Sequence, residues 1–159
     1  ELIIETSDDG NEWKEIDFKW KAGDISKKPK FVQPHQPRLD WQMWFSALFY
    51  ERVAEYFKKT YGRDPVSQEE HFSLMRQVPI SKRYRWFYLF LNRIFEGEKE
   101  VLSLLKNGKI GPAPKYLRVW LYDYHFTSIT ERSESGNWWK RDNQRLILPK
   151  FSKEEIWIP

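Results

Sequence analysis

The chain has 159 residues, no cysteine and a formal net charge of +4, from 27 basic and 23 acidic side chains. This length supports one domain, residues 1–159, with a single hydrophobic core. The lack of cysteine excludes a disulfide scaffold, a thiolate nucleophile and a zinc site with cysteine ligands. Aromatic residues make up 18% of the chain and nine of them are tryptophan, so either the core is unusually aromatic or some rings face a partner.

The N-terminal residues predict a β-hairpin. Residues 1–6 form a short apolar strand, and residues 7–11 are rich in the Ser, Asp, Gly and Asn that favour a tight turn. Residues 12–21 alternate between apolar and charged side chains, which is typical of a half-buried strand. The apolar positions are Ile16, Phe18 and Trp20. The turn also resembles a hairpin of discoidin-type β-sandwich modules, which leaves a carbohydrate-binding module open as an alternative.

A helix is predicted to follow the proline-rich loop at residues 21–37, because Pro37 disfavours helical geometry in the residue before it. Its apolar residues recur at i, i+3 and i+4 over about four turns, so we expect one buried stripe at the centre of the core. The stripe comprises Trp41, Phe45, Leu48, Phe49, Val53, Tyr56 and Phe57. Asp40 lies at the cap or in the first turn, where its carboxylate can accept free backbone N–H groups. Gly62 suits the end of the helix.

The remaining pattern predicts an α+β fold. We expect, in chain order, a short helix from Ser67 to Val78, a helix from about Lys82 to Phe95, a helix from Glu98 to Lys106, a strand over residues 116–126, a polar turn from Glu131 to Asn137, and a possible last strand after Trp138 and Trp139. The strand near 116–126 has large side chains on both faces, so we place it centrally. It forms a small, mainly antiparallel sheet with the N-terminal hairpin, packed on three to four aromatic-rich helices.

Candidate partner-binding residues cluster where the loop meets the long helix. They are His35, Gln36, Arg38, Asp40, Trp41 and Trp44. Two interpretations stay open. In the structural one, Asp40 caps the helix, Arg38 pairs with a carboxylate or stacks on an indole, and His35 satisfies loop carbonyls. In the functional one, the proline-locked junction presents a rigid patch to a protein partner.

Tyr122, Trp138 and Trp139 form a second candidate contact region. If the chain is extended at the two tryptophans, their rings point to opposite faces, so one can be buried while the other is more open. An open indole flanked by Lys140 and Arg141 has the chemistry of an interaction hot spot. Burial of both rings between sheet and helices is the competing interpretation.

No pattern predicts an enzyme, so we expect no catalytic residue, no metal site and no cofactor. The three histidines lack the spacing of a zinc site, and the chain has neither a serine-hydrolase elbow nor a glycine-rich phosphate loop. Asp123 and His125 could form an acid–base pair. Neighbouring polar residues on a strand are more often hydrogen-bonded parts of the interior, which is the interpretation we favour.

Nucleic acid is not an expected partner, although the pI is about 9.2. The basic residues form no sustained stripe, and the aromatic residues among them, near residues 82–88, have the spacing of a helix core. Carbohydrate binding is the better alternative, because indole faces suit stacking on sugars.

Six blocks of sequence, in order, carry a resemblance to one family. They are Lys19-Trp20-Lys21-Ala22-Gly23-Asp24 with Pro29; the run Pro34-His35-Gln36-Pro37-Arg38-Leu39-Asp40-Trp41-Gln42-Met43-Trp44-Phe45; Glu96-Gly97; Pro112 with Pro114-Lys115-Tyr116; Tyr122 with Tyr124; and Gly136-Asn137-Trp138-Trp139-Lys140-Arg141. Together they resemble the soluble C-terminal domain of the lipase maturation factor family. The segment at residues 50–80 is longer than that pattern leads us to expect, so we interpret it as a peripheral helical insertion.

The resemblance implies a soluble domain of a longer, multi-pass membrane protein, to which the missing spans would anchor it. Its implied role is to assist the folding and assembly of secreted lipases, or of another client protein, by non-covalent binding. The implied location is the endoplasmic reticulum membrane, with this domain on the lumenal side, or the inner membrane in a bacterium. A strand at Glu1 without a leader fits a piece of a longer chain.

Overall fold

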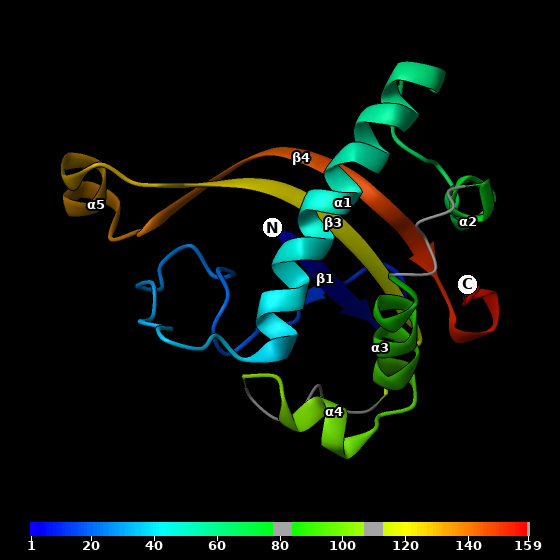
Figure 1. The fold of residues 1–159 in the computed structure, drawn as a ribbon, viewed down its shortest axis with the longest axis horizontal. Helices are drawn as coiled ribbons and strands as arrows, with labels where there is room; N and C mark the ends of the chain where they lie inside the picture. Colours follow the sequence, from blue (N-terminus) through cyan, green and yellow to red (C-terminus); the bar gives the residue numbers. More distant parts are fainter. Residues whose placement is uncertain (78–83, 107–112, 159) are drawn as a thin grey trace.

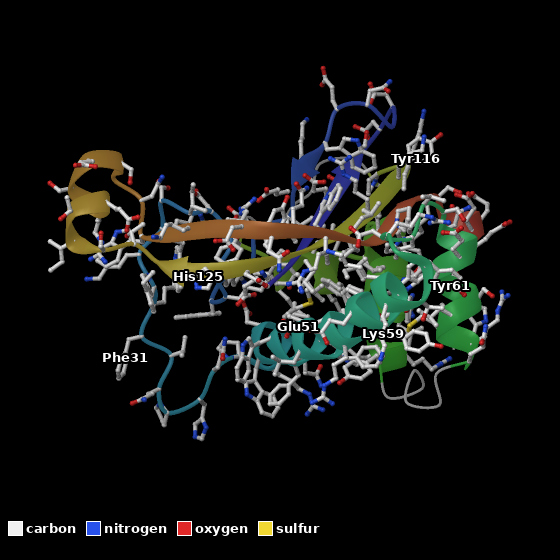
Figure 2. All side chains as sticks on the ribbon, turned by 90° about the horizontal axis from the view of Figure 1, so that it is seen from above. Phe31, Glu51, Lys59, Tyr61, Tyr116 and His125 are labelled. Atoms are coloured by element: carbon white, nitrogen blue, oxygen red, sulfur yellow. The ribbon has the colours of Figure 1, made fainter. Side chains whose placement is uncertain are left out.

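The computed structural model describes residues 1–77, 84–106 and 113–158. It is an α+β fold in which a four-stranded sheet, ordered β2-β1-β3-β4, carries its main helices on one face (Figures 1 and 2), so the predicted fold class is confirmed. The elements are β1 (Leu2–Ser7), β2 (Lys14–Glu15), α1 (Arg38–Tyr61), α2 (Gln68–Gln77), α3 (Arg85–Phe95), α4 (Lys99–Ser103), β3 (Tyr116–Phe126), α5 (Ile129–Ser135), β4 (Trp139–Phe151) and a 3₁₀ turn (Lys153–Glu155). Within those ranges, no helix is both long and apolar enough to cross a bilayer.

The sheet is antiparallel, and β3 lies at its centre as predicted. β3 pairs with β1 from Leu2↔Leu121 to Ser7↔Tyr116, and with β4 along most of its length. Its residues at 117, 119 and 121 are buried beneath the helices, while the alternate side chains are half-buried on the other face. Beyond the end of β1, strands β3 and β4 continue as a two-stranded ribbon that carries α5 at its tip (Figure 1).

The second strand of the predicted hairpin is much shorter than residues 12–21. Only Lys14 and Glu15 form β2, paired antiparallel with β1. Ile16 still donates its N–H to the Ile4 carbonyl of β1, but beyond it the chain leaves the sheet, and Phe18 forms an isolated bridge to Leu105, just after α4. Ile16 and Phe18 are buried as the alternation indicated, whereas Trp20 is exposed.

The predicted buried stripe of α1 is wrong in part. Phe49, Val53 and Phe57 are buried as predicted, whereas Trp41, Phe45, Leu48 and Tyr56 are exposed, and the buried face is centred further around the helix. That face comprises Asp40, Met43, Ala47, Tyr50, Ala54 and Phe57, with Ser46, Phe49 and Val53 beside it. Ala47 and Ala54 have small side chains, which let the helix backbone approach β1, β3 and β4 closely. A row of indole and phenyl rings would hold the helix further from the sheet.

The segment that we interpreted as a peripheral insertion contributes to the core in its described part, residues 50–77. Tyr50 and Met75 are fully buried, and α2 packs against β4. His71 of α2 is buried, with its Nε2 2.9 Å from the Tyr88 hydroxyl of α3. Gly62 ends α1 in a left-handed conformation, as predicted. The predicted end of the short helix at Val78 lies outside the described residues.

Near the C-terminus the structure adds one helix and lengthens one strand. The predicted polar turn forms α5, opened by a capping box in which the Ser128 hydroxyl accepts from the Glu131 N–H and the Glu131 carboxylate accepts from the Ser128 N–H. The last strand is confirmed as β4, which runs for 13 residues. After the 3₁₀ turn, Trp157 packs near Phe72 and Tyr88 and closes one end of the core. The predicted helix boundary at Lys82 lies outside the described residues, and α4 ends at Ser103, before the predicted end at Lys106.

Candidate functional site

Asp40 joins the proline-rich loop to α1. Its carboxylate is buried and one oxygen, Oδ1, accepts the backbone N–H groups of Trp20 at 2.8 Å and Lys21 at 2.9 Å. The helix cap itself is Pro37, whose carbonyl accepts from the Trp41 N–H. Asp40 therefore binds backbone N–H groups as predicted, but they belong to the start of the loop, about 20 residues earlier in the chain.

The other residues at the loop–helix junction face outward. His35 and Arg38 are exposed and form no hydrogen bond or ion pair with the residues that the structure describes. Gln36 is half-buried. Among the described residues, His35 and Arg38 therefore do not form the structural contacts that we considered, and both side chains are exposed at the surface.

An apolar patch lies on the solvent side of α1. It is made of Trp41, Trp44, Phe45 and Leu48, which we call the α1 patch, and their exposed fractions are 47%, 48%, 41% and 45%. Phe45 lies between the two indoles, with ring centroids 4.7 Å from Trp41 and 5.2 Å from Trp44. Four large apolar side chains on about two turns of one helix, each about half in water, form a contiguous surface that the described residues leave uncovered.

The loop that precedes α1 lies beside this patch. Phe31 is 81% exposed and points away from the sheet, and the loop lies on the same side of the sheet as α1 and Glu51 (Figure 2). Trp20, at the start of the loop, is also partly exposed and carries the Lys30 ammonium 4.6 Å from its ring centroid. The aromatic surface therefore extends from the helix onto the loop.

A cavity of about 640 Å³ lies between the loop, α1 and the β3–β4 ribbon. Its walls include Trp20, Gln36, Trp44, Glu51, Asp123 and Trp139. Trp44 and Leu48 belong both to these walls and to the α1 patch, so the two surfaces are continuous. The loop and α1, which are neighbours in the sequence, meet the distant β3–β4 ribbon here, which is why no single motif predicted the cavity.

Trp138 and Trp139 hold the loop from opposite sides. Trp139 donates its Nε1–H to the Lys27 carbonyl at 2.8 Å and stacks on Phe126, with centroids 4.4 Å apart. Trp138 lies under the guanidinium of Arg132, 3.8 Å from its ring centroid, and its backbone N–H donates to the Ile25 carbonyl. Both rings are half-buried, so these indoles fix the loop against β4 and Trp139 also faces the cavity.

Tyr122 lies at the edge of the cavity beside a partly exposed ion pair. The Arg141 guanidinium is 5.0 Å from the Tyr122 ring centroid and binds the Glu15 carboxylate at 2.6 Å. Tyr124, two residues further along β3, donates its hydroxyl to the Gly23 carbonyl at 2.6 Å, and burial raises its pKa above the ordinary value. Tyr124 therefore stays neutral and connects the sheet to the loop.

The two polar residues on β3 that we weighed for catalysis are held apart from each other. Asp123 Oδ1 binds Arg145 at 2.5 Å and Asp123 Oδ2 accepts from Asn143 at 2.9 Å. His125 is exposed and its Nε2 is 3.6 Å from Asp142. Across the described ranges, no three His, Cys, Asp or Glu side chains are arranged to hold a metal ion. The cavity thus presents aromatic rings and hydrogen-bonding groups.

The fold and this surface define a compact α+β domain with a solvent-facing aromatic helix, the character of a binding domain. The family model described as "Lipase maturation factor C-terminal domain" matches residues 1–85 and 80–149. The chain therefore belongs to the lipase maturation factor family, as the sequence blocks indicated.

The curated relatives support the same family assignment. Lipase maturation factor 2 of Xenopus tropicalis is 33% identical over 155 residues, which cover 94% of this chain and 18% of that protein. Lipase maturation factor 2 of Homo sapiens is 31% identical over 157 residues, 96% of this chain and 18% of that protein. Lipase maturation factor 1 of Homo sapiens is 29% identical over 147 residues, 91% of this chain and 21% of that protein. The chain spans about a fifth of these relatives' length. No solved structure matches it significantly.

Proposed function

We propose that this domain assists the folding or assembly of secreted lipases by holding a partly folded client through the α1 patch. The names of its relatives, lipase maturation factors 1 and 2, favour a folding factor over an enzyme. The observation that carries the proposal is the exposure of Trp41, Trp44, Phe45 and Leu48 on one helix face. Contiguous apolar side chains at a protein surface mark sites of contact with other proteins.

The physical basis is burial of the patch against apolar surface that a client exposes before it is folded. Fully burying a large apolar side chain is favourable by roughly 1.5–3 kcal/mol, and these four are already about half buried. Their combined further burial is therefore favourable by a few kcal/mol, enough for reversible binding and release. His35, Gln36 and Arg38 at the edge of the patch supply polar contacts to the same partner. No cofactor or covalent step is required.

The wider setting follows from the family. We propose that the domain is part of a longer, multi-pass membrane protein whose spans lie outside this chain. In that arrangement it faces the lumen of the endoplasmic reticulum, or lies at the inner membrane in a bacterium. Its partners are secreted lipases or other client proteins and not nucleic acid, because the basic residues are mixed with acidic ones and form no continuous stripe.

The test measures binding of the domain to a secreted lipase diluted from denaturant. Immobilised domain should capture the partly folded lipase and not the native enzyme. Trp41→Ala and Phe45→Ala should each lower that affinity several-fold, because each removes a ring from the centre of the patch. Ile129→Ala provides the matched control, since Ile129 is exposed on α5, remote from α1 (Figure 1).

Circular dichroism of each variant establishes that the fold is intact before binding is compared. Equal affinity of the parent protein and both patch variants for the partly folded lipase would refute the proposal. Equal loss in the α5 control would also refute it, because binding would then not depend on the α1 patch.

A further inference from the structure

The cavity beside the α1 patch has rigid aromatic walls. Trp139 is fixed by its hydrogen bond to the Lys27 carbonyl and by its stacking on Phe126. Tyr124 is fixed by its hydrogen bond to the Gly23 carbonyl, and Trp44 packs edge-on against Phe45. Rings held in this way offer flat faces to a ligand at little cost in side-chain entropy.

Most charges around the cavity are compensated within the chain. The pairs are Glu1 with Lys21, Asp17 with Lys27 and Lys106, Asp24 with Lys27, Asp123 and Glu51 with Arg145, and His125 beside Asp142. Lys19 donates to the Ser103 carbonyl, and Lys28 and Lys30 lie over the rings of Trp138 and Trp20. A charged ligand that bound a paired group would have to break its ion pair. A neutral ligand would leave all of them in place.

Planar hydrogen-bonding groups remain between the rings. Glu51 is 3.8 Å from Arg145, so its carboxylate has free lone pairs, and each Asp123 oxygen accepts only one hydrogen bond. The Gln36 amide makes no hydrogen bond with the described residues and provides both a donor and an acceptor. The cavity therefore combines apolar ring faces with fixed acceptors and a free amide.

We propose that this cavity binds a neutral oligosaccharide. The C–H face of a hexose carries a partial positive charge that suits the negative face of an aromatic ring, while its hydroxyl groups both donate and accept hydrogen bonds. The volume of about 640 Å³ lies within the range of small-molecule sites, roughly 300–1,000 Å³. The proposal rests on the cavity and not on the N-terminal hairpin that first suggested sugar binding.

The cavity also explains how one client could engage two surfaces. Trp44 and Leu48 belong to both the cavity and the α1 patch, so a sugar chain in the cavity lies next to polypeptide on the patch. In this extension, which rests on the proposed function, the ligand is a neutral glycan attached to the client. The two contacts then reinforce each other through effective concentration.

The test is a titration of the domain with two neutral probes, mannotriose and maltotriose, followed by tryptophan fluorescence and amide chemical shifts. At least one probe should bind saturably, and the affinity should persist at high salt because no net charge is involved. Trp44→Ala should lower the affinity about tenfold, the value of one stacked ring. Gln36→Ala should lower it several-fold, and a loss of folding is not expected there because the amide has no partner in the described structure.

Trp41→Ala is the matched comparison, because Trp41 has nearly the same exposure on the same helix but does not line the cavity. It should weaken client binding and leave sugar binding unchanged. The inference is overturned if neither probe binds, if Trp41→Ala and Trp44→Ala lose sugar affinity equally, if only acidic oligosaccharides bind in a salt-sensitive way, or if an unglycosylated peptide displaces the sugar from the cavity. In each case client binding through the patch is measured separately, so the proposed function stands or fails on its own.

Discussion

Replacing Asp40 should release the loop from α1 and destabilise the whole domain. Its carboxylate is 1% exposed, and Oδ1 accepts two backbone N–H groups at 2.8 and 2.9 Å. A hydrogen bond to a charged group contributes about 1.5–3 kcal/mol, and a buried donor left unpaired costs about 1–3 kcal/mol. Because the loop is at the surface, water relieves part of that cost. We therefore expect Asp40→Ala to lower the free energy of unfolding by about 2–4 kcal/mol.

Asp40→Asn separates the geometry from the charge. Both hydrogen bonds end on one oxygen, and the asparagine carbonyl can occupy the same position. The Asn variant should therefore lose only the charge contribution, about 1 kcal/mol. Urea-induced unfolding measures both variants, and hydrogen exchange reports the amides of Trp20 and Lys21. These amides should exchange much faster in the Ala variant than in the Asn variant.

Two results would contradict this reasoning. One is equal stability of the Ala and Asn variants, which would mean that the accepting oxygen is not what fixes the loop. The other is unchanged exchange at Trp20 and Lys21 after Asp40→Ala, which would mean that other contacts hold the loop in place.

Three further predictions test the core and the caps. Burial lowers the pKa of His71 to about 4 from its ordinary 6.5, so its contribution to stability is present above pH 6.5 and is lost as the pH falls toward 4. Unfolding titrations should show that the free energy of unfolding falls by about 3 kcal/mol across that pH window. The same fall in His71→Gln would show that the pH dependence does not come from His71. Met43→Ala should lower the free energy of unfolding by about 2–5 kcal/mol because Met43 is fully buried, and Phe45→Ala should lower it by about 1 kcal/mol or less. Urea unfolding measures both variants, and a larger loss for Phe45→Ala would mean that α1 is rotated. Ser128→Ala should destabilise α5 by about 1 kcal/mol, seen as faster amide exchange confined to α5; unchanged exchange would show that the capping box contributes little.

The sheet could be predicted because its signals are local. Alternation along residues 116–126 places large side chains on both faces, and only a central strand can cover both. The position of β3 followed from that pattern. The strand at 12–21 was predicted too long because alternation also describes an extended segment that packs on a helix end, as Phe18 does against Leu105. The capping box Ser128-x-x-Glu131 was a readable signal for α5 that the polar composition of this segment obscured.

The orientation of α1 could not be predicted because large apolar residues occupy more than one face of this helix. Its spacing allows one stripe through Trp41 and Phe45 and another through Met43 and Tyr50. Which stripe meets the sheet is decided by small residues and by the contact of Asp40 with the start of the loop, a long-range interaction that periodicity does not contain. The candidate residues were therefore chosen from motifs, while the cavity forms only when the loop and α1 meet the distant β3–β4 ribbon.

The orientation of α1 links the two proposed sites. Asp40, Met43 and Ala47 lie on the buried face, so the hydrogen bonds from the loop to Asp40 determine which side of the helix faces the sheet. The same rotation leaves Trp41 and Phe45 in water and brings Trp44 to the cavity wall. A helix turned so that Trp41 and Phe45 faced the sheet would cover the patch and would also take Trp44 out of the cavity wall. The family sequence blocks at residues 19–24 and 34–45 meet at this contact. The contact therefore stabilises the junction of loop and helix and also leaves the α1 patch exposed.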